Sequence, residues 1–597
     1  MREFHCVTAP SIRYEIAVRE PHRHLFDVAL IAGGSFDDSV EVRMPVWSPG
    51  SYLIREYARN VQDVTVSAPD GRPLSFEKVS KNAWRIDGAA GGFAFRFRLY
   101  ANEPNVQSPH LDDTHGFIHP PAVCPWIEGY SDQPCDVALD LPDGWRIATG
   151  LEPVAGKANT FRASDYDELL DCPIECGDFV DLQFKARRRP HRIVISGGGT
   201  FDEKALLKET RRIVETVIDF WGGAPPYRHY TFICHVYPGS RGGLEHRNST
   251  VLGIDAHSFH PRKKYEDQVL TLIAHEFFHT WSVKRIRPAA LGPFDYGQEN
   301  YTRLLWVFEG ITSYYDNLLV VRAGLMPAKR YFKNLSDFIG KLHRTPGRLR
   351  QSLAESSFDT WIKFYRQNEH SPNALVNYYL KGMLVGLLLD LHVREKTDGR
   401  VSLDDVMREL WRRYQDDGAG IGEAEFEAIA VEVSGLDLRR FFRRAVHSAE
   451  ELDFNAALRP FGLRLVTKRK GEASENGDGP TPWIGVETDA KDNAVAIRTV
   501  YEASPAERAG LSAGDIVLAV DGLRVTPDTF KARLRAMTPG RSVDIAFFRR
   551  DRLRSATLKI DRTFETEMSI EPVADAGERA RRLRDAWLGS ALESDAG

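Results

Sequence analysis

Two histidines four residues apart, with a glutamate after the first, are the residues whose spacing most clearly predicts chemistry. The segment HEFFH at 275–279 lies in an apolar stretch without proline or glycine, so a helix is expected. Positions four apart lie on one helix face, so the imidazoles of His275 and His279 can reach a single ion. Zinc accepts imidazole nitrogen and keeps one position open for water in catalytic sites. Glu276, beside the first ligand, can then act as general base toward that water.

A third metal ligand is expected downstream, in the segment WVFEGITSYYD at 306–316. Glu309 lies in its apolar part, where an unpaired charge is costly and metal coordination would remove that cost. Asp316 lies two helical turns later on the same face and is a candidate partner for the ring of a ligand histidine. The alternatives are an exposed or salt-bridged Glu309 and a solvated Asp316. The prediction is one Zn²⁺ per chain, held by His275, His279 and Glu309.

A histidine helix followed by a Glu-Gly helix resembles the gluzincin peptidases, whose metal ligands are two histidines and one glutamate. Upstream, GGLEH at 242–246 is similar to the Gly-x-Met-Glu-Asn strand of gluzincin aminopeptidases. That resemblance implies that Glu245 binds the free α-amine of the substrate, with Gly243 and Leu244 beside it in the substrate-binding strand. This chain has Leu244 and His246 where that group has Met and Asn. A surface carboxylate is the alternative for Glu245.

The segment NYYLKG at 377–382 resembles the Tyr-Glu-Lys-Gly segment of the same peptidases. Their tyrosine donates a hydrogen bond to the oxyanion that forms when water attacks the peptide carbonyl. The matching residue is Tyr379, because it precedes Lys381 and Gly382 by the same interval. Tyr378 is the nearest rival, and simple packing is the alternative for either ring.

Taken over nearly its whole length, the chain resembles the glycyl aminopeptidase family, a gluzincin branch that carries a PDZ domain. The segments WSPGSY at 47–52, GLEHR at 243–247 and Thr280-Trp281 fit that family. The distance of thirty positions from His279 to Glu309 also fits this branch. The resemblance implies removal of N-terminal glycine or other small residues from peptides with a free N-terminus.

A C-terminal segment resembles a PDZ domain of the bacterial protease type. It contains WIGV at 483–486, ASPAERAGL at 503–511 and GDIV at 514–517. In such domains a peptide adds a strand to the sheet edge, and backbone amides hold its terminal carboxylate. The groove is expected at Trp483, Ile484, Gly485 and Val486. Docking of a C-terminal peptide and a purely structural role both stay open.

Periodicity predicts a multidomain α+β protein. Alternating runs such as FAFRFRL at 93–99 favour strands in the first part, and helical periods follow from Phe201. A stretch rich in Gly, Pro, Lys, Glu and Ser from Thr467 to Pro482 predicts a linker, and 462–466 a further PDZ strand. A charged helix from Glu578 is expected to fray. The expected parts are a β-sandwich at 1–185, a thermolysin-like zinc catalytic domain at 186–385, a helical domain at 386–460, a PDZ domain at 461–565 and a C-terminal tail at 566–597.

Bulk properties bound the function further. The chain has 597 residues, too many for one core, and a formal charge of -5, which calls for no nucleic-acid or anionic-membrane partner. The six cysteines form no regular framework, so free thiols are expected. A metal clip at Cys172 and Cys176 is the alternative. No signal peptide and no membrane span are visible, and a cytoplasmic protein is expected.

Three functions are therefore compared. The leading prediction is a zinc aminopeptidase that removes N-terminal residues by metal-activated water attack. A zinc endopeptidase with PDZ substrate docking is the second, and it would leave Glu245 without an amine to bind. An inactive, peptidase-like PDZ scaffold is the third, and the intact set of predicted zinc ligands argues against it.

Overall fold

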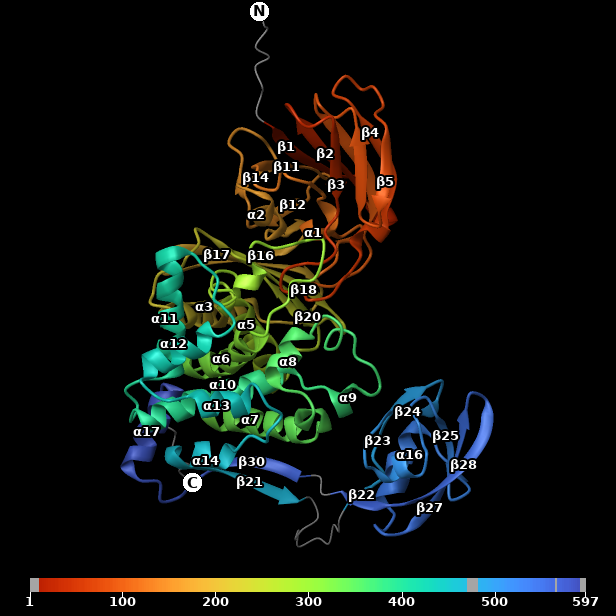
Figure 1. Cartoon of the computed structure of the whole chain (residues 1–597), viewed down its shortest axis with the longest axis vertical. Helices are drawn as coiled ribbons and strands as arrows, with labels where there is room; N and C mark the ends of the chain where they lie inside the picture. Colours follow the sequence, from red (N-terminus) through yellow and green to blue (C-terminus); the bar gives the residue numbers. More distant parts are fainter. Residues whose placement is uncertain (1–9, 470–480, 564–565, 591–597) are drawn as a thin grey trace, which may run out of the picture. The chain divides into compact units, whose positions relative to one another are not determined.

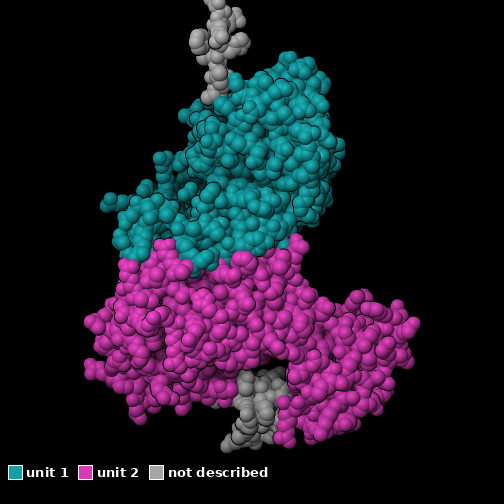
Figure 2. Space-filling model, in the orientation of Figure 1, with its two compact units in different colours: residues 1–302, 315–325, 407–423 teal, residues 303–314, 326–406, 424–597 magenta. Residues whose placement is uncertain are grey.

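The chain divides into two compact units, each described by itself. The computed structural model describes residues 10–469, 481–563 and 566–590. Figure 2 colours the two units. Unit 1 comprises residues 1–302, 315–325 and 407–423, and unit 2 comprises residues 303–314, 326–406 and 424–597.

Unit 1 begins with a β-rich region of three sheets. Alternating residues of its first strand, Ile12, Tyr14, Ile16 and Val18, are buried, as the period of two requires. The seven-stranded sheet has the order β13-β14-β11-β1-β2-β7-β4, and the four-stranded sheets have the orders β10-β3-β6-β5 and β12-β15-β9-β8. The strands are β1 (Ser11–Val18), β2 (Leu25–Gly33), β3 (Ser39–Arg43), β4 (Val61–Ser67), β5 (Phe76–Ser80), β6 (Ala83–Asp87), β7 (Phe93–Tyr100), β8 (His110–Leu111), β9 (His115–Ile118), β10 (Trp126–Ile127), β11 (Cys135–Asp140), β12 (Arg146–Thr149), β13 (Glu152–Pro153), β14 (Thr160–Ala163) and β15 (Ile174–Gly177), with short helices α1 (Pro120–Val123) and α2 (Tyr166–Leu170). The predicted β-rich N-terminal domain is confirmed.

The described cysteines are all free and buried: Cys124, Cys135, Cys172, Cys176 and Cys234. The prediction of free thiols is confirmed for them, while Cys6 lies outside the described residues. Among the described residues, no candidate group of metal ligands includes a cysteine, so the alternative of a metal clip at Cys172 and Cys176 finds no support.

A five-stranded mixed sheet, in the order β16-β17-β18-β20-β19, carries the histidine helix of unit 1. Its strands are β16 (Val180–Ala186), β17 (Arg189–Gly197), β18 (Tyr230–Tyr237), β19 (Gly243–Glu245) and β20 (Ser249–Asp255). The helices of this region are α3 (Glu203–Phe220), α4 (Arg262–Tyr265), η3 (Glu266–Leu270) and α5 (Thr271–Phe278). Figure 1 shows α3 and α5 beside these strands.

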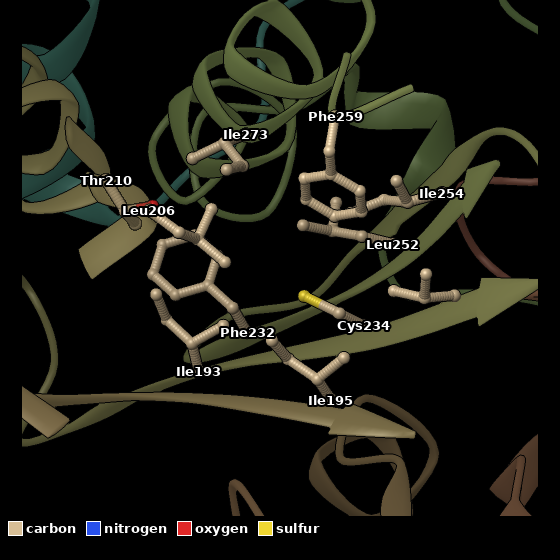
Figure 3. Close-up of a pocket in the computed structure, with 11 residues that line it drawn as sticks. Ile193, Ile195, Leu206, Thr210, Phe232, Cys234, Leu252, Ile254, Phe259 and Ile273 are labelled. Carbon is tan, nitrogen blue, oxygen red and sulfur yellow. The ribbon is translucent and has the colours of Figure 1, made fainter. Parts of the chain in front are cut away.

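The packing between this sheet and its helices leaves almost no free space. Side chains from three strands, such as Phe232, Cys234 and Leu252, face Leu206 of α3 and Ile273 of α5 (Figure 3). The gap among them measures about 10 Å³, no more than about one water molecule needs. Such close packing fixes the position and rotation of α5, and therefore the side chains that α5 presents.

Two glycines bring two helices of unit 2 into backbone contact. A Cβ on Gly310 of η5 (Trp306–Ile311) would lie 2.6 Å from the Cα of Gly382 in α10 (Tyr378–Lys396). Further helices of unit 2 before the PDZ-like region are α7 (Ala328–His343), η6 (Pro346–Leu349), α8 (Leu353–Phe358), α9 (Ser371–Ala374), α12 (Glu425–Ser434), α13 (Arg439–Ala445), α14 (Phe454–Leu458) and η7 (Arg459–Phe461). Two further helices, α6 (Thr312–Arg322) and α11 (Leu403–Asp417), contain residues of both units.

The PDZ domain of unit 2 lies between two paired strands. Its sheet has the order β23-β24-β25-β27-β28, with β26 beside β25 and β22 paired to β29. The elements are β22 (Thr481–Trp483), β23 (Val486–Lys491), β24 (Ala494–Val500), α15 (Pro505–Arg508), β25 (Ile516–Val520), β26 (Leu523–Arg524), α16 (Pro527–Arg535), β27 (Ser542–Arg549), β28 (Arg552–Lys559) and β29 (Asp561–Thr563). The flanking strands β21 (Leu463–Arg469) and β30 (Thr566–Pro572) pair with each other, so the strand predicted at 462–466 lies outside the PDZ sheet.

The described residues after the predicted PDZ domain include a packed helix, which differs from the frayed tail expected. Helix α17 (Glu578–Leu588) buries Trp587 completely, and its indole donates a hydrogen bond to the hydroxyl of Tyr314 at 2.8 Å. In the sequence, the many charged residues of α17 obscure this apolar face. Most of the predicted linker, at 470–480, lies outside the described residues, while its two ends lie in strands. The predicted domain limits stay predictions.

One helical stretch, Ser371–Lys396, is long and apolar enough to cross a membrane. However, 78% of its apolar window is buried inside the protein, and the core helix of a soluble protein passes the same test.

Candidate active site

The two motif histidines lie on one face of α5, and each has one ring nitrogen engaged. Their ring centroids are 4.7 Å apart. The Nδ1 of His275 lies 2.9 Å from Oδ2 of Asp316, and the Nδ1 of His279 lies 2.6 Å from the carbonyl oxygen of Ser282. Donation from Nδ1 places the lone pair on Nε2 in both rings. This is the tautomer that a metal-ligating histidine needs.

Asp316 is held for this contact by its own surroundings. It lies on α6, is almost completely buried, and accepts a second hydrogen bond from the side chain of Asn317 at 2.6 Å. Burial raises the pKa of Asp316, and the hydrogen bond from His275 opposes that rise. The carboxylate therefore orients the imidazole and stabilises positive charge on it.

Two glutamates lie close to the second histidine. Glu245, Glu276 and His279 each offer a ligand atom, and these atoms all lie within 4.8 Å of one another. A Cβ on Gly243 would lie 2.1 Å from Oε1 of Glu276. Glycine at 243 is therefore needed for the carboxylate of Glu276 to lie against this strand. Leu244, which lies between Gly243 and Glu245 in β19, is fully buried in an apolar cluster.

Glu245 carries a buried carboxylate oxygen that no described residue satisfies. It ends β19, where its backbone pairs with Thr250 of β20, and its side chain is 4% exposed. Its Oε1 has no hydrogen-bond partner within the described part of the chain. A buried oxygen of this kind costs free energy unless a donor arrives. The arrangement fits a site whose partner is supplied by a ligand.

The β-rich region covers this carboxylate with a glycine. A Cβ on Gly50 would lie 2.7 Å from both oxygens of Glu245. A small cavity beside them, of about 10 Å³, is bordered by Tyr52, Leu291 and Phe294. The segment 47–52 was noted in the sequence only for its likeness to a family, and its contact with Glu245 was not predicted.

In unit 2, Glu309 and Tyr379 lie on the two helices joined by the glycine contact. Glu309 is 2% exposed in the π-helical turn η5. Burial, and next the negative charge of Glu309, raise the pKa of Tyr379 well above its ordinary value. The phenol therefore keeps its proton at neutral pH and can donate a hydrogen bond.

The two neighbouring tyrosines have different surroundings. Tyr378 is completely buried, and its hydroxyl accepts a hydrogen bond from Thr360 at 3.3 Å. Tyr379 is only partly buried and lies beside Glu309. Tyr378 thus has the surroundings of a core residue, whereas Tyr379 has those of a residue at a site.

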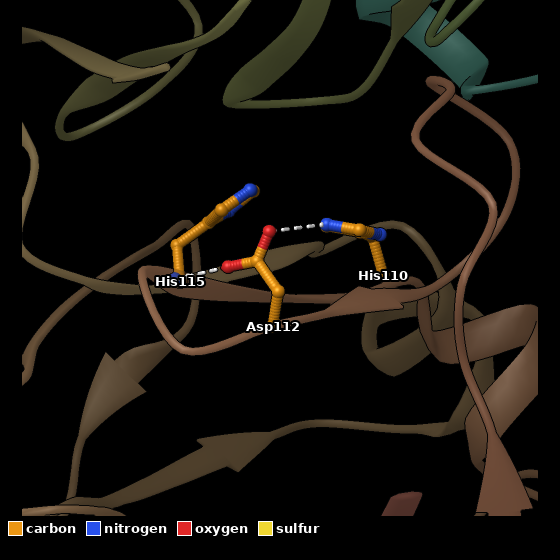
Figure 4. A group of neighbouring side chains, drawn as sticks. All are labelled: His110, Asp112 and His115. Carbon is orange, nitrogen blue, oxygen red and sulfur yellow. Dashed lines mark hydrogen bonds and ion pairs between the residues drawn. The ribbon is translucent and has the colours of Figure 1, made fainter. Parts of the chain in front are cut away.

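A second cluster of histidines and carboxylates lies elsewhere in unit 1. Figure 4 shows its outer part, where Nε2 of His110 lies 3.0 Å from Asp112 and the backbone N–H of His115 also donates to that carboxylate. Deeper in, Nδ1 of His115 and Nε2 of His235 lie 2.8 and 3.0 Å from the two oxygens of Glu175. The cluster has the donor types of a metal site.

Hydrogen bonds within the protein account for this cluster. The remaining nitrogen of His115 bonds the hydroxyl of Tyr237 at 2.6 Å, so both of its ring nitrogens are engaged. Burial alone would raise the pKa of Glu175, but the neighbouring His115 and His235 lower it to about 2. A buried carboxylate with both oxygens satisfied is a structural element. We therefore assign this cluster to stability.

The predicted PDZ groove residues lie at one margin of that domain's sheet. Val486 begins β23, which is an edge strand, so its outer side is open to strand addition within the described residues. Ile484 packs in the domain core, and Gly485 has a positive φ of 80°. A Cβ at 485 would lie 2.1 Å from Ser504. Trp483 ends β22.

Three family models match the sequence. They are the Peptidase M61 N-terminal domain over residues 13–178, the M61 glycyl aminopeptidase over residues 268–385 and a PDZ domain over residues 482–560. No curated protein matches the chain.

Solved structures resemble the fold. An aminopeptidase N family protein from Idiomarina loihiensis is 33% identical over 97% of this chain and 100% of that chain, with a TM-score of 0.89. An M1 zinc metallopeptidase from Deinococcus radiodurans is 12% identical over 74% of this chain and 95% of that chain, with a TM-score of 0.47. Yeast LTA4 hydrolase is 13% identical over 76% of this chain and 70% of that chain, with a TM-score of 0.46. Only the first of these three is similar enough to support assignment to a family.

Fold, site and family models together define a zinc metallopeptidase of the aminopeptidase type whose substrates are peptides. The chain belongs to the M61 glycyl aminopeptidase family, with a PDZ domain near its C-terminus. The resemblance inferred from the sequence and the predicted fold class are thereby confirmed.

Proposed function

We propose that this enzyme removes N-terminal glycine and other small residues from peptides with a free N-terminus. One observation carries the proposal: the buried Oε1 of Glu245 has no partner among the described residues and lies close to Glu276 and His279. A substrate ammonium is a donor of matching charge. An endopeptidase would have no use for this oxygen.

One zinc ion per chain, held by His275, His279 and Glu309, is part of the proposal. The imidazoles fit, because engagement of Nδ1 leaves Nε2 for the metal in each ring. Glu309 fits by type, since a buried carboxylate in an apolar helix needs a positive partner. Two imidazoles and one carboxylate are the donors that a catalytic zinc site uses. When bound, the ion would polarise the substrate carbonyl and lower the pKa of water.

The protein's own residues then have distinct roles in our proposal. Glu276 accepts the proton of the attacking water and passes it to the leaving amine. Tyr379, whose phenol stays protonated, donates a hydrogen bond to the oxyanion. Glu245 holds the ammonium and so fixes the cut one residue from the N-terminus.

Two features support a preference for small N-terminal residues. Gly50 lies against Glu245, and the adjoining cavity measures only about 10 Å³, so the wall beside the proposed amine site is closely packed. Family membership supports the same preference.

The open edge of β23 supports a second role, the docking of C-terminal peptides on the PDZ domain.

The test is hydrolysis of a panel of aminoacyl chromogenic substrates, with and without a metal chelator, together with glycyl and acetyl-glycyl versions of one peptide. An acetylated substrate leaves Glu245 buried and unpaired, which costs about 3–5 kcal/mol. The expected loss is therefore about 10²–10⁴-fold in kcat/KM. Glu245→Ala should abolish most of this discrimination. If the wild type cleaves both forms equally well, the enzyme is an endopeptidase.

A further inference from the structure

A cavity of about 350 Å³ in unit 2 lies beside the start of α10. Its volume is within the range of small-ligand sites, about 300–1,000 Å³. Its wall includes Val376 and Asn377, which lead into Tyr379, and on the PDZ side Glu487 and Tyr501. None of the peptidase residues named above, and none of the four predicted groove residues at 483–486, lines this cavity.

A buried amide donor faces this cavity without a partner. Gln351 is 6% exposed, and its Oε1 accepts a hydrogen bond from the backbone N–H of Val376 at 3.0 Å. That bond fixes the orientation of the amide, so the NH₂ group is the free end. Within the described part of the chain, Nε2 of Gln351 has no hydrogen-bond partner. A group that accepts hydrogen bonds would satisfy it.

The cavity also has more positive charge than its surroundings balance. Lys363 pairs with Asp359 at 2.5 Å, and Glu487 pairs with Arg498 at 2.5 Å. These four charges cancel.

Two further cations of the lining remain. Lys341 and Arg344 form no ion pair with any described residue, and both lie at the C-terminal end of α7. Arg344 also lies near Tyr501, since its charge acts on that hydroxyl. The uncompensated donors favour a ligand that carries an anionic group.

One shared side chain links the cavity to the proposed catalytic tyrosine. Phe364 lines the cavity, and its ring centroid lies 4.9 Å from that of Tyr378 and 5.6 Å from that of Tyr379. The apolar residues Pro372 and Leu375 line it as well. Such a wall suits peptide side chains better than a bare inorganic anion.

We propose that this cavity binds the C-terminal carboxylate of short peptide substrates, through Arg344, Lys341 and the amide of Gln351. The inference rests on the proposed aminopeptidase function, because it takes the bound carboxylate to be that of a peptide substrate. The enzyme would then discriminate between a free and a blocked C-terminus. The cavity adjoins β23 through Glu487, the residue that follows the predicted groove segment 483–486.

The experiment compares glycyl peptides of three to six residues, each as the free acid and as the C-terminal amide. The acid should have the higher kcat/KM by about 10-fold at the best length, the factor expected of one charge-assisted hydrogen bond. The double variant Arg344→Gln with Lys341→Gln should lower kcat/KM for the free acid to the value for the amide. Gln351→Glu keeps the bond from Val376 and replaces the donor by an acceptor, so it should also abolish the preference. Lys333→Gln, on α7 but outside the cavity lining, is the matched control and should keep it.

Binding is measured separately by calorimetry with the Glu276→Gln variant, which is expected to bind peptide without turnover. Tighter binding of the acid supports the cavity even if the predicted N-terminal preference fails. Equal affinity and equal kcat/KM for acid and amide would overturn the inference. So would a parallel loss of both forms in Arg344→Gln with Lys341→Gln, which would indicate a structural role at the end of α7. Saturable binding of inorganic phosphate, lost in that variant and without any preference for the peptide acid, would assign the cavity to free anions instead.

Discussion

The α-carbon of Gly50, in the β-rich region, lies directly against the carboxylate of Glu245. A Cβ at position 50 would come within 2.7 Å of both carboxylate oxygens, a distance that real Cβ atoms essentially never show. The two residues are 195 positions apart in the sequence and belong to different structural regions of unit 1. The N-terminal region therefore supplies a wall of the proposed amine site.

Replacing Gly50 by alanine should displace the Glu245 carboxylate. We expect kcat/KM for a glycyl substrate to fall by about 100-fold, because a shift of about 1 Å at a catalytic or binding group has effects of that size. The φ of +88° at Gly50 also strains an alanine. Gly71→Ala is the matched control, since its φ is +89° but no atom lies within 4 Å of the added Cβ. Equal activity losses in both variants would contradict a specific contact with Glu245.

Changing Tyr379 to phenylalanine should lower kcat by about 100-fold, as loss of an oxyanion donor does, with a smaller effect on KM. Tyr378→Phe removes a hydroxyl that accepts a hydrogen bond from Thr360 in the core, and it should keep kcat near the wild-type value. Steady-state kinetics on a glycyl anilide measures both parameters. If Tyr378→Phe is inactive while Tyr379→Phe retains its kcat, the assignment of the oxyanion donor is displaced by one residue.

Asp316→Ala should weaken zinc binding by about 10–100-fold, because the hydrogen bond to Nδ1 of His275 orients that ligand. Competition with a chelator of known affinity measures this change. Asp337→Ala removes a surface carboxylate that pairs with Lys333 at 2.5 Å and should leave the affinity unchanged. An unaltered zinc affinity in Asp316→Ala would mean that Asp316 does not support the metal site.

Glu175→Gln should destabilise the fold by about 3–5 kcal/mol at pH 6, because it removes one partner of a buried pair. The folded pKa of Glu175 is lowered from 4.5 to about 2, so its carboxylate stabilises the fold above about pH 4.5. Burial would lower the pKa of His115, but Glu175 raises it above 6.5, so the imidazolium stabilises the fold below about pH 6.5. That contribution is lost as the pH rises through the folded pKa.

The effect of Glu175→Gln on the melting temperature should therefore be larger at pH 6 than at pH 9. Scanning fluorimetry at both values measures it. Asp140→Asn is the control, since its pair with Arg19 is largely exposed and should contribute less than about 1 kcal/mol. If Glu175→Gln lowers the melting temperature equally at both pH values, Glu175 contributes through packing alone.

Local sequence patterns were sufficient to predict the helix that carries His275, Glu276 and His279, because a four-residue spacing has one meaning on a helix. Contacts between distant segments were not predictable in this way. Nothing in the residues around Gly50 indicates that Glu245 lies next to it. The contact of Gly310 with Gly382 joins two motifs that the sequence presents separately. The carbonyl of Ser282, which engages His279, is a backbone atom and leaves no mark in residue type.

The strand β30 was missed for a similar reason. Its partner β21 is about a hundred residues earlier, and the pairing depends on two short strands on either side of an independent domain. The charged helix α17 shows three large apolar anchors in the sequence, Leu583, Trp587 and Leu588. Its burial depends on contacts with residues distant in the sequence, such as Tyr314, and could not be predicted from the helix alone.

The pairing of Arg469 with Thr566 gives the PDZ domain an unusual status in the chain. The chain enters and leaves the domain at neighbouring positions of the two-stranded sheet formed by β21 and β30. The domain is therefore an insertion between the two strands of a hairpin. A tight turn joining 469 to 566 should yield a folded enzyme that still hydrolyses small aminoacyl substrates. Truncation at Thr467 should instead lower its melting temperature, since it also removes Trp587 and the bond to Tyr314. Sequence change could thus exchange one recognition module for another, provided that the new module replaces the cavity wall formed by Glu487 and Tyr501.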